Sequence, residues 1–181
     1  MKKNMDITVL FLFYVGVGDY NRAVHVWIFA ESTQELLLQL RSVSNSKESW
    51  PGLWNISTAS QIAAGDSSLV TARRKLQKEL GVILPKDAFE MIFDFLPETV
   101  RITNGDKFKT DVYLVTTLDP IPLEAFTLQE SEVSAVKYIH YLKYKSLLGS
   151  QNSEYVPYDV DGQYGQLFDI LTQRYALRSI C

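Results

Sequence analysis

The chain has 181 residues, a net charge of −3 and one cysteine, and 46% of its residues are apolar. This composition suits one packed domain and argues against disorder. The charge gives no basic footprint for nucleic acid, and the lone Cys181 excludes a disulfide framework and a cysteine-rich metal site. We therefore expect a single domain over residues 1–181, a reducing cytoplasmic setting and no nucleic-acid or membrane partner.

The first 17 residues open the chain in an atypical way. Lys2 and Lys3 precede an apolar run from Ile7 to Val15. This run is too short to span a bilayer, which takes roughly 20 residues. It is either a strand that completes the sheet or a secretory targeting segment. The strand is the preferred interpretation, because Asp6 precedes the run and no small-residue cleavage site follows it.

The next stretch alternates between strands and turns. Residues 24–30 carry apolar side chains on both faces, which is typical of a central strand. A turn at 31–34 precedes a second predicted strand at 36–41. Residues 42–49 are polar and predict a loop, and residues 53–57 predict a short strand.

The strongest pattern lies between Ser60 and Val82. A Gly-Asp-Ser-Ser turn offers polar N-caps, and Gly81 suits the position just after a helix. Between them an apolar stripe recurs at steps of three and four residues, as on a helix that packs against a core. The stripe consists of Leu69, Ala72, Leu76 and Leu80. The sequence therefore predicts one helix from Ser68 to Leu80.

Strands and helices continue in no strict order after this helix. Asn104-Gly105 predicts a hairpin between strands at 91–102 and 108–118. The other predicted elements are a helical turn at 85–89, a strand at 133–141, a short helix at 141–148 and a final helix at 164–176. This order favours an α/β/α sandwich with a mixed β-sheet.

Three charged residues of the predicted helix, Lys75, Lys78 and Glu79, share a face roughly opposite the stripe, since residues three and four apart lie above one another. The plain interpretation is a solvated charged face. The alternative is a binding site, because the spacing matches a family motif.

That motif is the Nudix box, which contains a glycine, a glutamate, an Arg-Glu pair, a Glu-Glu pair and a second glycine at fixed spacing. Its positions fall on Ser60, Asp66, Arg74, Lys75, Leu76, Lys78, Glu79, Gly81 and Val82. Asp66 is a shortened carboxylate, Ser60 replaces the glycine, and Lys75 and Lys78 replace glutamates. The chain thus resembles the Nudix family, with a degenerate box.

The neighbouring segments resemble the isopentenyl-diphosphate isomerase-like branch of that family, and most of all the Nudix module that plants carry fused ahead of a dipeptidyl peptidase III. These segments are HVWIF at 25–29, LLLQLRS at 36–42 and WPGLWNIS at 50–57. The resemblance runs from about Gly18 to about Gln173 and implies a Nudix-type sandwich. The isomerase needs a cysteine and a histidine shortly after its Pro-Gly turn, and residues 56–61 hold neither, which excludes that mechanism.

The resemblance also implies that box glutamates hold the Mg²⁺ or Mn²⁺ that activates water against a diphosphate. Glu79 remains as the main ligand and Asp66 as a weak one. Lys75 and Lys78 repel a dication, so we expect weak metal binding. The same lysines suit a diphosphate directly, because an ammonium group binds phosphate as a point charge.

Four further residues take roles by resemblance. Arg41, at a predicted strand end, is a substrate-binding candidate, whereas Arg74 and Gly81 are structural parts of the box. Glu132, rather than Glu130, matches the loop carboxylate that serves Nudix hydrolases as base or extra ligand. The alternative for both glutamates is a solvated loop position.

The two histidines, His25 and His140, lack partners at metal-ligand spacing and are expected to be packed strand residues.

Two functions from different classes follow. One is a metal-dependent diphosphohydrolase for nucleoside-diphosphate-linked or prenyl diphosphates, weakened by loss of box glutamates, with Glu79 and Glu132 as catalytic residues. The other is a catalytically silent Nudix domain, without a cofactor, that binds a ligand or a protein.

Overall fold

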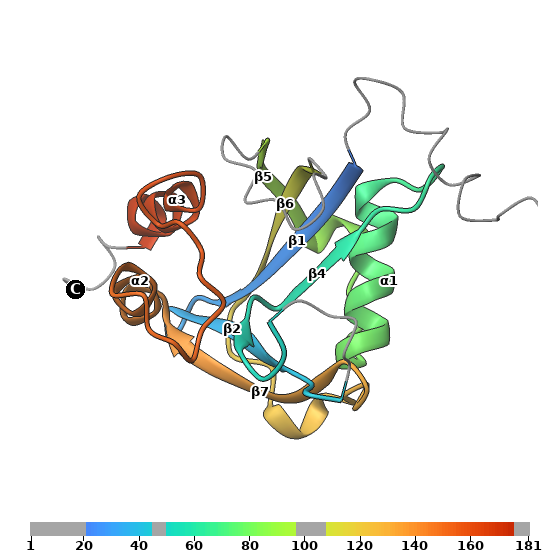
Figure 1. Cartoon of the computed structure of the whole chain (residues 1–181), viewed down its shortest axis with the longest axis horizontal. Coiled ribbons are helices and arrows are strands. Elements are labelled where there is room, and N and C mark those ends of the chain that lie inside the picture. The colour runs from blue at the N-terminus through green and yellow to red at the C-terminus, as the bar shows by residue number, and fades with distance from the viewer. Residues whose placement is uncertain (1–20, 45–49, 97–107, 176–181) are drawn as a thin grey trace, which may run out of the picture.

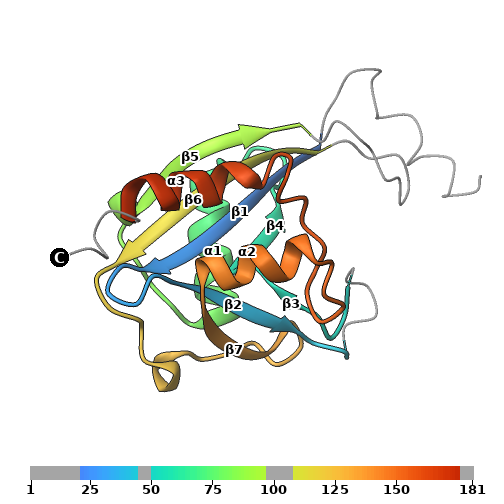
Figure 2. The same ribbon diagram turned by 90° about the vertical axis from the view of Figure 1, so that its left-hand side faces the viewer.

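The computed structural model describes residues 21–44, 50–96 and 108–175. A seven-stranded mixed sheet forms the middle layer, with helix α1 (Ser68–Leu80) on one face and helices α2 (Tyr141–Gly149) and α3 (Gly165–Tyr175) on the other (Figure 1, Figure 2). This arrangement confirms the expected α/β/α sandwich. The predictions for residues 1–17 and for the turn at 104–105 lie outside the described residues.

The sheet has the order β3-β2-β1-β6-β5, with β4 also paired to β1 and β7 also paired to β2. The central pair β1–β6 is parallel and the other pairs are antiparallel. The strands are β1 (Asn21–Ala30), β2 (Glu35–Arg41), β3 (Trp54–Asn55), β4 (Thr58–Gln61), β5 (Phe89–Phe95), β6 (Phe108–Thr117) and β7 (Val133–His140). Two short 3₁₀ helices, η2 (Lys86–Ala88) and η3 (Leu123–Ala125), lie in the connections.

The two faces of the sheet bury two separate cores, because successive side chains of a strand point to opposite faces. Val26 and Ile28 of β1 pack with Leu76 of α1 in one core. Trp27 and Phe29 pack with residues of α2 and α3 in the other. In the part of the chain described here, no helix is long and apolar enough to cross a membrane.

Helix α1 begins and ends where the sequence predicts. The Ser67 hydroxyl accepts a hydrogen bond from the Val70 backbone N–H at 3.3 Å, which caps the first turn. Gly81 ends the helix in the left-handed conformation, with φ +71°, and its N–H bonds the Gln77 carbonyl at 3.0 Å.

Residues 58–61 form strand β4, where we predict no strand from the sequence. Strand β2 pairs with β1 over two residue pairs only, and β4 takes its place along the rest of β1. The Ser57 hydroxyl bridges β1 and β2 where these two strands separate. It accepts a hydrogen bond from the Ile28 N–H at 2.9 Å and donates one to the Leu37 carbonyl at 2.7 Å. The sequence does not predict this strand because Thr-Ala-Ser-Gln lacks an apolar alternation, and partner strands rather than its own composition make it a strand.

Gly81→Ala should destabilise the fold by about 2 kcal/mol more than Gly65→Ala does. Both glycines have positive φ, +71° and +86°, so alanine strains the backbone at each. A Cβ on Gly81 would also lie 2.7 Å from the Thr127 Cβ, whereas one on Gly65 meets nothing within 4 Å. Urea unfolding of the two variants measures the difference, and equal losses would contradict a packing role for Gly81.

Candidate functional site

A row of polar residues on α1 lies against the sheet. Thr71 is fully buried and Glu79 is 4% exposed, whereas Lys78 faces solvent. The plain interpretation of these positions as a solvated charged face is therefore wrong for Glu79. The buried arc of α1 is wider than the apolar stripe, because positions 71, 75 and 79 follow one another at four-residue steps beside it.

Both carboxylate oxygens of Glu79 have partners from this chain. The Oε1 atom forms an ion pair with the Lys75 Nζ at 2.7 Å. The Oε2 atom accepts a short hydrogen bond from the Thr58 hydroxyl of β4. The Lys75 side chain is 22% exposed and that of Glu79 5% exposed, so water screens this pair weakly. The Glu79 carboxylate, which the family resemblance implies to be a metal ligand, is thus bound by an ammonium group and a hydroxyl instead.

Asp66, the other predicted metal ligand, points to a different partner. Its Oδ2 atom accepts from the Arg74 guanidinium at 2.7 Å, and the two side chains are 30% and 53% exposed. This ion pair joins the loop before α1 to the second half of the helix. The structural role of Arg74 stays a prediction, and this contact is what supports it.

The oxygen atoms that Mg²⁺ or Mn²⁺ needs are poorly supplied. These ions take hard oxygen ligands, and an ammonium group within the ligand sphere opposes them. Lys75 and Thr58 engage Glu79, and Arg74 engages Asp66. Within residues 21–44, 50–96 and 108–175, no three His, Cys, Asp or Glu side chains are grouped to hold a metal. The described donor set therefore does not fit a resident divalent ion, and the ligand roles of Glu79 and Asp66 stay predictions.

Backbone contacts bring the remaining candidates to the C-terminal end of α1. The Gln129 N–H donates to the Glu79 carbonyl at 2.9 Å, and the Glu132 N–H donates to the Gln129 carbonyl at 2.8 Å. The Ser42 N–H in turn donates to the Glu132 carbonyl at 2.9 Å, directly after Arg41. The fold thus links Arg41, Glu132 and the end of α1, which lie far apart in the sequence, whereas Glu130 is exposed.

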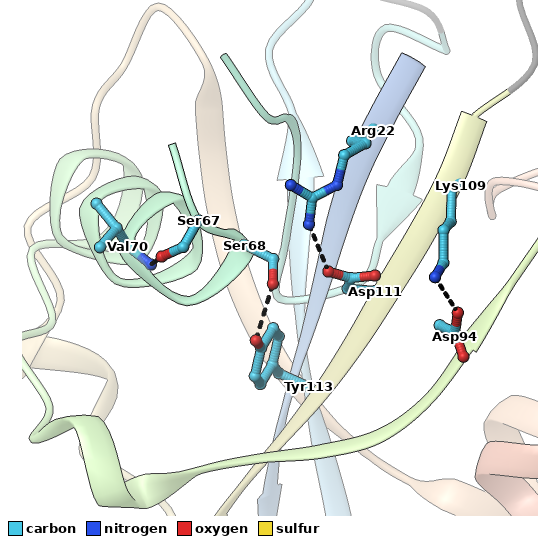
Figure 3. Close-up of polar contacts among 8 residues, drawn as sticks. All are labelled: Arg22, Ser67, Ser68, Val70, Asp94, Lys109, Asp111 and Tyr113. Carbon is cyan, nitrogen blue, oxygen red and sulfur yellow. Dashed lines mark hydrogen bonds and ion pairs between the residues drawn. The ribbon is translucent and has the colours of Figure 1, made fainter. Parts of the chain in front are cut away.

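Sequence reasoning missed a polar cluster at the other end of α1, which Figure 3 shows. Asp111 of β6 is 5% exposed and forms an ion pair with Arg22 of β1 at 3.2 Å. The Ser68 and Tyr113 hydroxyls lie 2.9 Å apart and join α1 to β6 (Figure 3). The available signal was Asp111 itself, a carboxylate directly before the apolar run at 112–115. The hydroxyl pair holds α1 on β6, and the ion pair ties β1 to β6.

Both histidines are packed residues, as expected. The His25 ring stacks on Tyr164, with its Nδ1 atom 2.7 Å from the Tyr164 hydroxyl, and Phe95 lies at its edge. Burial lowers the pKa of His25 to about 4, which leaves the ring neutral at pH 7. The His140 ring accepts from the Leu142 N–H at 3.3 Å and so caps α2.

Comparison with known protein sequences agrees with this geometry. The NUDIX domain family matches residues 19–158. The chain is 63% identical over 161 residues to "Nudix hydrolase 3" of Arabidopsis thaliana. These aligned residues make up 87% of this chain and 20% of that protein. The chain thus spans about a fifth of the length of this relative. It is also 31% identical over 141 residues to an uncharacterized Nudix hydrolase of Listeria monocytogenes, covering 78% of this chain and 75% of that protein.

Solved structures share the fold at low sequence identity. The NUDIX domain of Shewanella oneidensis NrtR, complexed with ADP ribose, has a TM-score of 0.60 at 21% identity and covers 93% of this chain and 100% of that chain. A second structure is that of a bifunctional NMN adenylyltransferase/ADP ribose pyrophosphatase of Francisella tularensis, complexed with AMP and a Mn ion. It has a TM-score of 0.60 at 13% identity, and the match covers 92% of this chain and 45% of that chain. The sequence match over most of the chain and the shared sandwich lead to one conclusion: this chain belongs to the Nudix family.

Proposed function

We propose that this chain binds a diphosphate-containing small molecule, either nucleoside-diphosphate-linked or prenyl, and that its metal-dependent hydrolysis is weakened. The proposed ligand-binding residues are Lys75 and Lys78 of α1 and Arg41 at the end of β2. Membership of the Nudix family supports the diphosphate class. The ion pair between Lys75 and Glu79, at 2.7 Å, is the observation that carries the proposed weakening.

Lys75 has hydrogen-bonding capacity left for a ligand. An ammonium group has three donors, and Glu79 takes one of them. Lys78, one turn further along the helix, is exposed and adds a second positive charge on a flexible stem. Two ammonium groups on neighbouring turns thus offer donors to a diphosphate without a metal between them, while Glu79 offsets the charge of one.

For the residual hydrolysis we propose Glu132 as the general base and Glu79 as the second catalytic carboxylate. The support is positional, because the hydrogen bonds of Gln129 to Glu79 and Glu132 attach this loop to the end of α1. A general base has to come within hydrogen-bond reach of the attacking water, and this loop is the described segment that carries a carboxylate to that place.

The second candidate function is a catalytically silent Nudix domain that serves as a ligand-binding or protein-interaction module. The specific observation that favours it is the complete engagement of Glu79 by Lys75 and Thr58. This candidate predicts ligand binding with no turnover and no cofactor.

ADP-ribose is the first probe, because the related NrtR domain was solved with it, and isopentenyl diphosphate is the second. In calorimetry with EDTA present, we expect one of them to bind to the wild-type chain. Lys75→Met combined with Lys78→Met should weaken this binding about tenfold or more, as expected for lost charge-assisted hydrogen bonds. Lys86→Met, at an exposed lysine of η2, is the matched control and should leave affinity unchanged.

Turnover with excess Mg²⁺, followed as AMP from ADP-ribose or as inorganic phosphate from isopentenyl diphosphate, then separates the two candidates. Slow turnover supports the weakened hydrolase, and binding without turnover supports the silent module. No binding of either probe, or binding that ignores the two lysines, would contradict the proposal.

A further inference from the structure

Thr58 connects strand β4 to the carboxylate of Glu79 on α1. Its hydroxyl donates a hydrogen bond to the Glu79 Oε2 atom, and the two residues are only 1% and 4% exposed. Thr58 also pairs in register with Val26 in the middle of β1, so the neighbouring strand fixes its backbone. The hydroxyl therefore holds one oxygen of the carboxylate at a defined place on the sheet.

The other oxygen of this carboxylate faces Lys75. The Glu79 Oε1 atom lies 2.7 Å from the Lys75 Nζ atom, one helical turn away. The Lys75 side chain is 22% exposed, so it lies at the boundary between the interior and solvent, whereas Lys78 is exposed. A lysine that is free in solvent has to be ordered when a ligand binds, which lowers affinity by roughly two- to tenfold. The contact with Glu79 orders Lys75 before a ligand arrives.

We infer that Thr58 is a positioning residue, which acts on a bound diphosphate through Glu79 and Lys75. The hydroxyl fixes the carboxylate, the carboxylate fixes the ammonium group, and the ammonium group presents its remaining donors to the ligand. Residue 58 lies outside the box at 60–82, so β4 contributes a residue to the site. The effect on a ligand rests on the function proposed above, whereas the ordering of Lys75 by Thr58 is a property of the free chain.

The competing explanation is a purely structural hydroxyl. A buried carboxylate oxygen that loses its donor destabilises the fold, whatever the site binds. In that case the removal of the hydroxyl would lower stability without changing the order of Lys75. The test therefore has to report on Lys75 itself.

The ammonium signal of Lys75 provides this readout in the ¹⁵N-labelled full chain without ligand, and its loss in Lys75→Met assigns it. Thr58→Val keeps the size of the side chain and removes the hydroxyl, so it should lower the order parameter of the Lys75 ammonium toward that of the exposed Lys78. Thr58→Ser restores the donor and should keep the wild-type value.

Thr71→Val is the matched control. Thr71 is also fully buried on the inner side of α1, one turn before Lys75, and its hydroxyl has no hydrogen-bond partner within residues 21–44, 50–96 and 108–175. The control makes the same chemical change without breaking a described contact, so the order parameter of Lys75 should stay at the wild-type value.

Calorimetry in EDTA with ADP-ribose and with isopentenyl diphosphate tests the consequence for binding. Thr58→Val should weaken binding of the probe that the wild type accepts about threefold or more, and Thr58→Ser should restore it. In a Lys75→Met background, Thr58→Val should cause no further loss, because the hydroxyl acts through Lys75. A purely structural role would weaken binding equally in both backgrounds.

The indole signal of the fully buried Trp27 reports folding in every variant. Should Thr58→Val unfold, Thr58→Cys, with a weaker donor, takes its place. An unchanged order parameter of Lys75, or an equal loss of affinity in the two backgrounds, would overturn the role of Thr58 and leave the proposed function intact. Binding of neither probe to the wild type would contradict the proposed function instead, and the order parameter would still decide whether Thr58 positions Lys75.

Discussion

Replacing Lys75 and Lys78 together by glutamate should raise Mg²⁺-dependent hydrolysis of a bound diphosphate at least about 100-fold. The double change removes two cations from α1, frees Glu79 from its 2.7 Å ion pair and adds two carboxylates. A divalent ion bound there stabilises charge at a phosphoryl group by several kcal/mol, and roughly each 1.4 kcal/mol is tenfold in rate. Formation of AMP and ribose 5-phosphate from ADP-ribose, compared between the double variant and the wild type, measures the effect.

The matched control for this experiment is Lys86→Glu with Lys143→Glu, which makes the same change in net charge at two exposed positions away from the site. This control should remain as slow as the wild type. Calorimetry with Mg²⁺ shows whether the restored carboxylates bind metal, independently of turnover. Fast Mg²⁺-dependent turnover by the unmodified chain would refute the proposed weakening.

Acidification should destabilise the fold through His25 by about 2–3 kcal/mol as the pH falls from 6.5 to 4. Burial lowers the pKa of His25 to about 4 in the folded state, against 6.5 for an exposed ring. Between these values the unfolded chain binds a proton that the folded chain does not, so acid favours unfolding. The contribution is complete above pH 6.5 and is lost toward pH 4.

Urea unfolding at neutral and acidic pH measures this effect as the difference between the wild type and His25→Phe. The phenylalanine keeps a ring among Tyr164 and Phe95 and removes the titration, so its stability should fall less with acid. Tyr164→Phe removes the hydrogen bond at 2.7 Å while keeping the ring enclosed, and it should retain most of the pH dependence because burial is the cause. Equal acid sensitivity of the wild type and His25→Phe would contradict this account.

The elements with strong local patterns were predictable from the sequence. Helix α1 has an N-cap, a regular apolar stripe and a terminal glycine, so its bounds at Ser68 and Leu80 followed from residues within the helix. Strand β4 could not be found in this way. Its four residues pair with β1 because β2 diverges, and that divergence is a tertiary event with no signature in Thr-Ala-Ser-Gln.

The site was predictable in its residues and less so in its contacts. The family spacing singled out Lys75, Lys78 and Glu79, but helix geometry alone did not show that Glu79 is buried against Thr58. That burial depends on β4, which the sequence did not reveal.

The buried pairing of Lys75 with Glu79 also restricts the order in which mutations can convert one form of the box into the other. Lys75→Glu alone would place two carboxylates side by side in a poorly hydrated position, and breaking such a pair typically costs about 3–5 kcal/mol. That is a large share of a domain stability of roughly 5–15 kcal/mol. Lys78 is exposed, so its exchange for glutamate is nearly neutral. A chain that acquires the acidic box in single steps therefore tolerates Lys78→Glu first, and the second step becomes tolerable only where a divalent cation is abundant.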